Sequence, residues 1–239
     1  MSLITRRSIN TDNTANRPDY QGNPSLRPGL AWGLDASVEH FGTNGLVLSA
    51  SAFLRHIDDL IGSRLTLRNG RWLVTPDNDG KAKSGGVELE VKLPLQQLWP
   101  KAPALDVHMN IARNWSRAAN IPGPDNILPG QTPRSGKLGL DWRPAGTPLT
   151  LGGNLNVQSS SRSRSSPTTA AFSGSAHLMD LYGLWRFSPE IQFRLSASNL
   201  LRSDFVNRSW YFDASGSRSD SSASPVFRAL RINVDIKFK

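Results

Sequence analysis

The residues whose chemistry could support catalysis or metal binding are few and scattered. Histidine is the first candidate, because imidazole carries protons near neutral pH and is the commonest metal ligand. The sequence contains His40, His56, His108 and His177, and no two of them stand at a metal-ligand spacing. We therefore predict no metal site, and we interpret the histidines as ordinary polar positions in or beside strands.

Two other patterns invite a chemical interpretation that their context does not support. Asp58-Asp59 could serve acid/base chemistry, but it stands where a predicted strand ends, and hydrogen bonding at the base of a loop is the favoured role. Gly85-Gly86 and Gly152-Gly153 precede no predicted helix, so they are not phosphate-binding loops and instead indicate bends or close approach of strands. We predict no catalytic residues, no cofactor and no enzyme activity.

The elements that position the polar residues are strands, and residues 30–41 show the pattern. Leu30, Trp32 and Leu34 alternate with Gly33 and Asp35, which places apolar side chains on one face and polar side chains on the other. Such a segment has the length of about 10 residues that a tilted strand needs to cross the hydrocarbon of a bilayer.

The same alternation recurs along the chain and predicts an all-β antiparallel meander of about nine long strands. The seventh strand is the least regular, because Leu178 and Leu184 fall out of phase with their neighbours. The predicted strands are 30–41, 46–61, 87–93, 105–112, 138–143, 149–158, 176–187, 191–198 and 230–238.

The connections alternate in length. Short turns are predicted at 42–45, 95–103, 144–148 and 188–190, and long connections at 62–80, 117–133, 159–174 and 203–224. Within the first long connection we predict a polar hairpin around Asn69-Gly70. A transmembrane β-barrel explains both the alternation and the single apolar face, with the short turns toward the periplasm. A soluble β-sandwich explains only the apolar faces. We keep as the alternative a β-sandwich binding module that uses basic loops on an anionic glycan or nucleic acid, given the net charge of +9.

The amino-acid composition narrows the class of protein further. The chain has 239 residues, of which 38% are hydrophobic, and no run of about 18 apolar residues occurs, which excludes a helical membrane protein. Without cysteine it has neither disulfides nor thiolate metal sites. Residues 1–7 have no apolar core and no cleavage site, so they are not a secretory signal. An exported protein needs such a signal upstream, and we therefore expect the chain to be a fragment.

The polar face of the meander supplies the candidate functional residues. In a barrel these side chains line the lumen, where mixed charges hold a polar plug by hydrogen bonds and ion pairs. The lumen-lining candidates are Asp35, Glu39, Arg55, Glu88, Glu90, Asp106, Asp141, Arg194, Arg231 and Asp235.

Four motifs, in order along the chain, resemble those of TonB-dependent outer-membrane receptors of the siderophore type. Residues 23–35 (NPSLRPGLAWGLD) are similar to the family's "NPxLxPE…xxGxD" approach to a strand. Residues 48–61 (LSASAFLRHIDDLI) resemble its "(A/S)xFYRxIxDLI" strand, and residues 85–90 (GGVELE) its "GxELE" strand. Residues 195–201 (LSASNLL) resemble the segment before the last strand.

The resemblance covers about residues 23–238 and implies the C-terminal segment of a transmembrane β-barrel of about 22 strands. It implies an irregular lead-in at 1–29 and a barrel segment at 30–239, with the plug domain and the early strands absent. The implied function is uptake of a ferric siderophore or similar nutrient across the outer membrane of a Gram-negative bacterium. The implied partners are outer-membrane lipid and lipopolysaccharide, the missing plug and N-terminal strands, and a TonB-type energy coupler, with no nucleic acid.

Two departures from the family pattern and one physical constraint accompany this resemblance. Gly29 replaces the usual acidic residue, and Lys239 follows Phe238 where the family ends on an aromatic residue that the insertion machinery reads. Nine strands leave two open edges, and unpaired backbone groups in hydrocarbon cost several kcal/mol each. We therefore predict an open, curved sheet rather than a closed nine-stranded ring.

Overall fold

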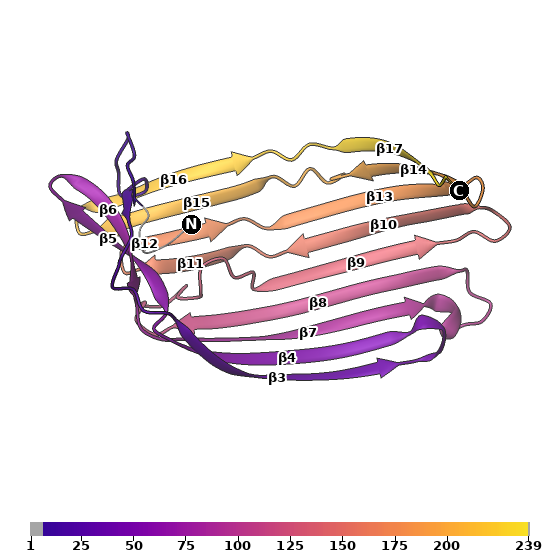
Figure 1. Cartoon of the computed structure of the whole chain (residues 1–239), viewed down its shortest axis with the longest axis horizontal. Helices are drawn as coiled ribbons and strands as arrows, with labels where there is room; N and C mark the ends of the chain where they lie inside the picture. The colour runs from indigo at the N-terminus through magenta and orange to yellow at the C-terminus, as the bar shows by residue number, and fades with distance from the viewer. Residues whose placement is uncertain (1–6, 239) are drawn as a thin grey trace.

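The computed structural model describes residues 7–238, which fold almost entirely as strands (Figure 1). Its largest sheet has nine antiparallel strands, and each pairs with the next one along the sheet in the order β17-β14-β13-β10-β9-β8-β7-β4-β3. These strands are β3 (Leu30–Phe41), β4 (Val47–Asp58), β7 (Ala82–Pro94), β8 (Leu105–Ala118), β9 (Arg134–Trp142), β10 (Leu149–Gln158), β13 (Ala176–Arg186), β14 (Ile191–Ser198) and β17 (Ala229–Ile236). The predicted nine-stranded meander is confirmed. So is the open sheet, because β3 and β17 do not pair with each other.

The register places most apolar side chains on one face of the sheet and most polar side chains on the other. Leu89 in β7 stands opposite Ile111 in β8, and the next residue along, Glu90, stands opposite Asn110. Because side chains alternate in a strand, this pairing places leucine beside isoleucine on one face and the carboxylate beside the amide on the other. The same separation continues to the last strand, where Ile232 pairs with Leu195.

The apolar face is covered by nothing else in the described chain. Leu34, Leu89 and Ile232 are 66%, 51% and 71% exposed, and no large side chain among the described residues is fully buried. A β-sandwich requires these side chains to pack beneath a second sheet. The soluble β-sandwich alternative is therefore wrong.

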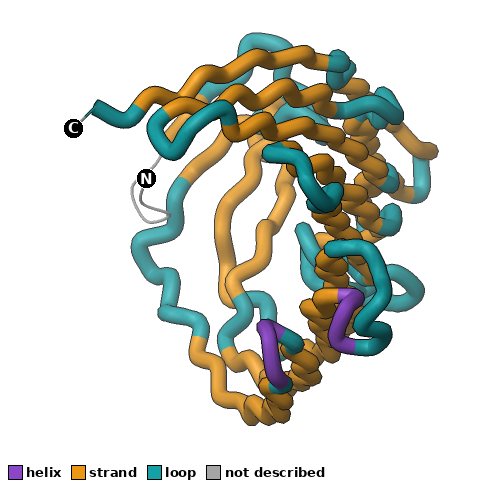
Figure 2. Tube along the Cα trace, turned by 90° about the vertical axis from the view of Figure 1, so that its right-hand side faces the viewer, coloured by secondary structure: helices purple, strands orange, loops and turns teal. Residues whose placement is uncertain are grey.

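The sheet curves around a hollow, as Figure 2 shows along the strands. The polar face lines this hollow: Glu88, Asn110, Lys137 and Asn154, from four neighbouring strands, together line one groove. The apolar face is consequently the convex one. We call the apolar side chains of this convex surface the apolar belt.

Short connections gather at one end of the sheet, which we call the turn end. Two of them contain single 3₁₀ turns, η1 (Thr43–Gly45) and η2 (Leu95–Gln97). Residues 143–148 and 187–190 form the other two. All four short connections were predicted. No helix within residues 7–238 is long and apolar enough to cross a membrane.

The opposite end, which we call the hairpin end, contains more strands than were predicted for its long connections. Residues 61–78 form a hairpin of β5 (Ile61–Arg68) and β6 (Arg71–Asn78). Four more strands, β11 (Ser161–Ser166), β12 (Thr169–Ser173), β15 (Phe205–Asp213) and β16 (Gly216–Ser224), form a separate sheet that continues the direction of the large one (Figure 1). β11 consists of serine and arginine, and serine dominates β16, so these two strands lack the apolar alternation by which strands are recognised.

The tip of the β5–β6 hairpin follows the rule for tight turns. Asn69 and Gly70 both have positive φ, 49° and 74°, as a two-residue turn that matches strand twist requires. The hairpin predicted at this Asn-Gly pair is confirmed.

The lead-in also contains paired strands, although an irregular segment was expected. β1 (Arg7–Ser8) pairs with β2 (Asp19–Gln21), and β2 runs parallel to β6. At the hairpin end the Trp72 ring of β6 packs edge-on against the Tyr211 ring of β15, with centroids 4.8 Å apart. The β5–β6 hairpin therefore reaches across the hollow to the far side of the curved sheet.

Candidate functional site

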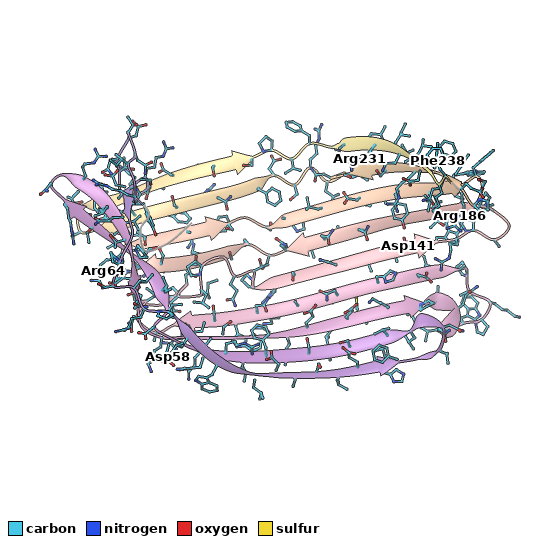
Figure 3. All side chains as sticks on the ribbon, viewed as in Figure 1. Asp58, Arg64, Asp141, Arg186, Arg231 and Phe238 are labelled. Carbon is cyan, nitrogen blue, oxygen red and sulfur yellow. The ribbon has the colours of Figure 1, made fainter. Side chains whose placement is uncertain are left out.

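All ten lumen-lining candidates lie on the concave face of the nine-stranded sheet. The pairing register places them there: Asp35 and Arg55 flank the Leu34–Leu54 pair, and Asp141 and Arg194 likewise alternate with outward leucines. Asp141 and Arg231 are labelled in Figure 3. That these residues line a transport lumen stays a prediction.

Several of the candidates form ion pairs along this face. The Arg55 guanidinium lies 2.6 Å from the Asp35 carboxylate across β3 and β4. Lys92 lies 3.0 Å from Glu90 on the same strand, and Arg143 pairs with Asp106. The charges are partly solvated, so each pair contributes little stability by itself and mainly fixes side-chain positions.

A denser cluster surrounds Asp141 near the turn end. The Tyr182 hydroxyl donates a hydrogen bond to Asp141, and the Arg194 guanidinium stacks 4.5 Å from the centre of the Tyr182 ring. His108 Nε2 lies 3.9 Å from Asp141 on the other side. Asp106 stands directly opposite Asp141, an unfavourable pairing of like charges that these donors and Arg143 offset.

Tyr182 and Asp180 belong to this polar surface and were not among the candidates. Asp180 accepts a hydrogen bond of 2.8 Å from the backbone N–H of Asn199. The sequence contains the pattern that would identify them, because Asp180 and Tyr182 alternate with the apolar residues Met179 and Leu181 and so belong to the polar face. Leu178 and Leu184, which share that phase, obscured it.

Two candidates lie on the edge strands. Glu39 is on β3 and Arg231 is on β17, the strands at the two open edges. Neither forms an ion pair with any residue of the described chain. Both charged side chains are therefore exposed on strands that have no pairing strand on one side.

The middle of the concave face forms a shallow groove of about 440 Å³. Its polar lining includes Glu88, Glu90 and Asp180, with Lys137 among them, and Asn110 donates a hydrogen bond to Glu88. Carboxylate, ammonium and amide groups in this arrangement suit hydrogen bonding to another polar polypeptide surface. No group of three or more His, Asp or Glu side chains within residues 7–238 is placed to hold a metal ion.

Asp58 and Asp59 make ion pairs where β4 ends, as expected for residues at the base of a loop. Asp58 lies 2.8 Å from Lys81 and 3.5 Å from His56. Asp59 lies 2.5 Å from Arg27 of the lead-in. Both aspartates therefore fix the chain around the β5–β6 hairpin.

A second polar contact attaches the lead-in to β6 at the hairpin end. Arg71 donates two hydrogen bonds to Asp19, of 2.8 Å and 3.0 Å, and the backbone N–H of Asn10 donates a third of 2.9 Å. These donors favour the ionised carboxylate, with Arg71 the largest contributor, and hold the pKa of Asp19 well below its usual range. The lead-in is thereby tied to the hairpin that crosses the hollow.

Comparison with known proteins agrees with this architecture. The family described as "TonB dependent receptor-like, beta-barrel" matches residues 4–200. None of the curated proteins matches the chain.

Solved structures with a similar fold include two transporters and one receptor. The copper transporter OprC is 17% identical, with a TM-score of 0.66, and the match covers 91% of this chain and 33% of that one. The ferric enterobactin receptor PfeA of Pseudomonas aeruginosa, crystallised as a G324V mutant, is 15% identical, with a TM-score of 0.62. That match covers 92% of this chain and 33% of the receptor chain. The FrpB iron transporter of Neisseria meningitidis is 15% identical, with a TM-score of 0.61, and the match covers 94% of this chain and 34% of that one.

The chain spans about a third of the length of these solved structures. At this identity they show the shared fold, and the family match over residues 4–200 shows the relationship. The chain belongs to the TonB-dependent receptor β-barrel family.

Proposed function

We propose that this chain forms the C-terminal part of the barrel of a TonB-dependent outer-membrane transporter that takes up a ferric siderophore or a similar scarce nutrient. The observation that carries the proposal is the uncovered apolar belt on the convex face, opposite a polar concave face. Exposure of so many large apolar side chains to water is unfavourable, whereas contact of the same surface with lipid is favourable. Lipid is therefore the partner of the convex face, and the outer membrane is the location.

The two open edges support the need for further strands. β3 and β17 each carry a row of backbone groups with no neighbour in the described chain, which hydrocarbon does not tolerate. Additional strands of the same receptor would pair with both edges and complete a barrel of about 22 strands. Glu39 and Arg231 would then meet charged or polar partners on those strands.

The concave face suits a polar plug. Its ion pairs and the Asp141–Tyr182–Arg194 cluster leave carboxylate, ammonium and amide groups facing the hollow. In a complete receptor a plug domain would bind this surface, and a TonB-type coupler would displace it to open a path. No enzyme activity is part of the proposal.

The cargo class rests on the neighbours of similar fold, described as a copper transporter, a ferric enterobactin receptor and an iron transporter. Deleting the gene that encodes this chain should abolish growth on one ferric siderophore under iron limitation. Excess inorganic iron should restore growth, because it bypasses a high-affinity transporter. Uptake of radioactive ferric siderophore that is unchanged by the deletion would contradict the cargo assignment.

A further inference from the structure

At the hairpin end, two recesses lie between the lead-in and the inner face of the β15–β16 pair. Tyr211 of β15 contacts Trp72 of the hairpin that crosses the hollow, so the side chains that share its face point inward. Arg218 of β16 is directly opposite Tyr211, and Asp220, two residues further along β16, lies on the same face. The recesses have volumes of about 350 Å³ and 400 Å³, and we call them together the lead-in groove.

The lead-in forms a fixed wall of this groove. Its residues 15–17 line the two recesses. Backbone hydrogen bonds of 3.2 Å and 3.0 Å between Thr14 and Arg17 close the turn that carries them. Asn13 exchanges two hydrogen bonds, of 2.8 Å and 2.6 Å, with the backbone of Trp72. A wall held in this way is ordered before a ligand arrives, which lowers the entropic cost of binding.

The smaller recess has an aromatic corner. The Trp72 and Tyr211 rings line it and stand at 65° to each other, so they offer apolar area on two sides. Its carboxylate, Asp213, accepts hydrogen bonds of 2.8 Å and 2.5 Å from the Ser215 N–H and hydroxyl, and one of 3.0 Å from the Tyr211 hydroxyl. These donors, Ser215 above all, lower the pKa of Asp213. They also leave this carboxylate little capacity to bind a ligand.

The larger recess has polar groups that lack a partner in the described chain. Arg17 and Asp220 line it and take part in no ion pair within residues 7–238. The Nδ2 of Asn16 is buried there and has no acceptor among the same residues, which is unfavourable until a ligand supplies one. A guanidinium, an amide and a carboxylate are thus free to bind one ligand. The serines beside them are Ser173, Ser209 and Ser222.

A sugar ring matches both recesses. Its faces carry C–H groups that pack on an aromatic wall, and its rim carries hydroxyls that each donate one hydrogen bond and accept others. A carboxylate beside a guanidinium and an amide complements both roles of a hydroxyl, whereas Asp220 disfavours an anionic ligand. Arg218 and Asp220 are about 7 Å apart at the rise of a strand, so two linked rings reach both recesses.

We propose that the lead-in groove binds a short neutral oligosaccharide. One ring packs against Trp72 and Tyr211, and the next is held by Asn16, Arg17 and Asp220. The inference goes beyond the proposed function, because binding in this groove requires neither transport nor a ferric siderophore. Failure to bind a sugar would therefore leave the uptake proposal standing, and failure of uptake would leave the groove standing.

The test uses the whole chain refolded in an amine-oxide detergent, which carries no sugar headgroup. Cellotriose and maltotriose are titrated by calorimetry, and we expect at least one of them to bind with a Kd of about 1 mM or below. The variant D220N/R17Q should weaken that binding at least about tenfold, because two charge-assisted hydrogen bonds are lost. The control D12N/R68Q removes the same charges from exposed residues outside the groove, and it should bind like the parent.

Hydrogen exchange of the parent chain keeps the test decisive if the double variant does not fold. A trisaccharide at about ten times its Kd should slow the exchange of residues 13–17 and 216–222 by about tenfold, with β7 and β8 unchanged. Tetraethylene glycol, which has ether oxygens but no ring, should slow neither segment. No binding of either trisaccharide at about 10 mM, or equal losses in D220N/R17Q and D12N/R68Q, would overturn the proposal.

Discussion

Tyr182 of β13 reaches across β10 to hydrogen-bond Asp141 of β9, and Gly152 is the residue of β10 that it crosses. Gly152 is directly opposite both residues, and a methyl group added there would collide with the Asp141 carboxylate and the Tyr182 ring. The absence of a side chain at Gly152 thus allows a hydrogen bond between two strands that are not neighbours in the sheet.

Gly152→Ala should break this link and destabilise the sheet by about 1–3 kcal/mol, because the methyl group overpacks the site and Asp141 loses its donor. Urea unfolding in detergent measures the change. Gly183→Ala is the matched control, since its methyl group would meet only Leu151 at an ordinary 3.5 Å. Equal destabilisation by the two substitutions would contradict the role given to Gly152.

The nine strands were predictable because their two faces meet different surroundings. Residues 87–93 alternate without interruption, and the structure extends that strand back to Ala82 through Gly85 and Gly86. Added methyl groups at these glycines would lie 2.9 Å from the Trp115 ring at Gly85 and against Phe53 and Asn114 at Gly86. The interpretation of such glycines as points of close approach is confirmed.

The hairpin end was not predictable from alternation. Both faces of β16 are largely exposed, so its many serines carry no periodic signal. The strands of the lead-in depend on the pairing of Asp19 and Tyr20 with Leu73 and Val74, more than fifty residues away. Local sequence contains no information about such a contact.

Lowering the pH should release the lead-in from β6. Arg71 holds the pKa of Asp19 below its ordinary value, so the contact is fully stabilising above an unfolded pKa of about 3.9 and is lost as pH falls through the lower folded pKa. The carboxyl resonance of Asp19, followed by NMR, should titrate below that ordinary value. Arg71→Gln should move its midpoint upward, whereas Arg68→Gln should not. A midpoint unchanged by Arg71→Gln would exclude this pairing.

Trp72→Ala should loosen the β5–β6 hairpin without unfolding the large sheet. The edge-on contact with Tyr211 contributes about 0.5–1.5 kcal/mol beyond the area it buries, and it is the ring contact between β6 and β15. Limited proteolysis should then cleave within residues 61–78 faster, with β7 and β8 still protected. Trp99→Ala, at an exposed turn residue, is the control. Unchanged cleavage would show that the hairpin does not depend on this contact.

Amide hydrogen exchange should distinguish the two edge strands of the sheet from the strands inside it. In detergent, β3 and β17 should exchange faster than β8, which pairs on both sides. Hydrogen-exchange mass spectrometry resolves these strands. Protection at β3 and β17 equal to that of β8 would mean that the edges are paired in solution, for example by a second copy of the chain.

The proposed membrane location requires the convex face of the sheet to meet lipid and the concave face to meet water. Ser51 and Ala52 are neighbours on β4, Ser51 opposite Glu88 and Ala52 opposite Val87, and the chain has no cysteine to interfere with labelling. Ser51→Cys and Ala52→Cys, each carrying a nitroxide, can be compared in detergent by accessibility to oxygen and to a water-soluble nickel complex. We expect oxygen to dominate at residue 52 and nickel at residue 51. Dominance of nickel at both positions would contradict a lipid-facing apolar belt.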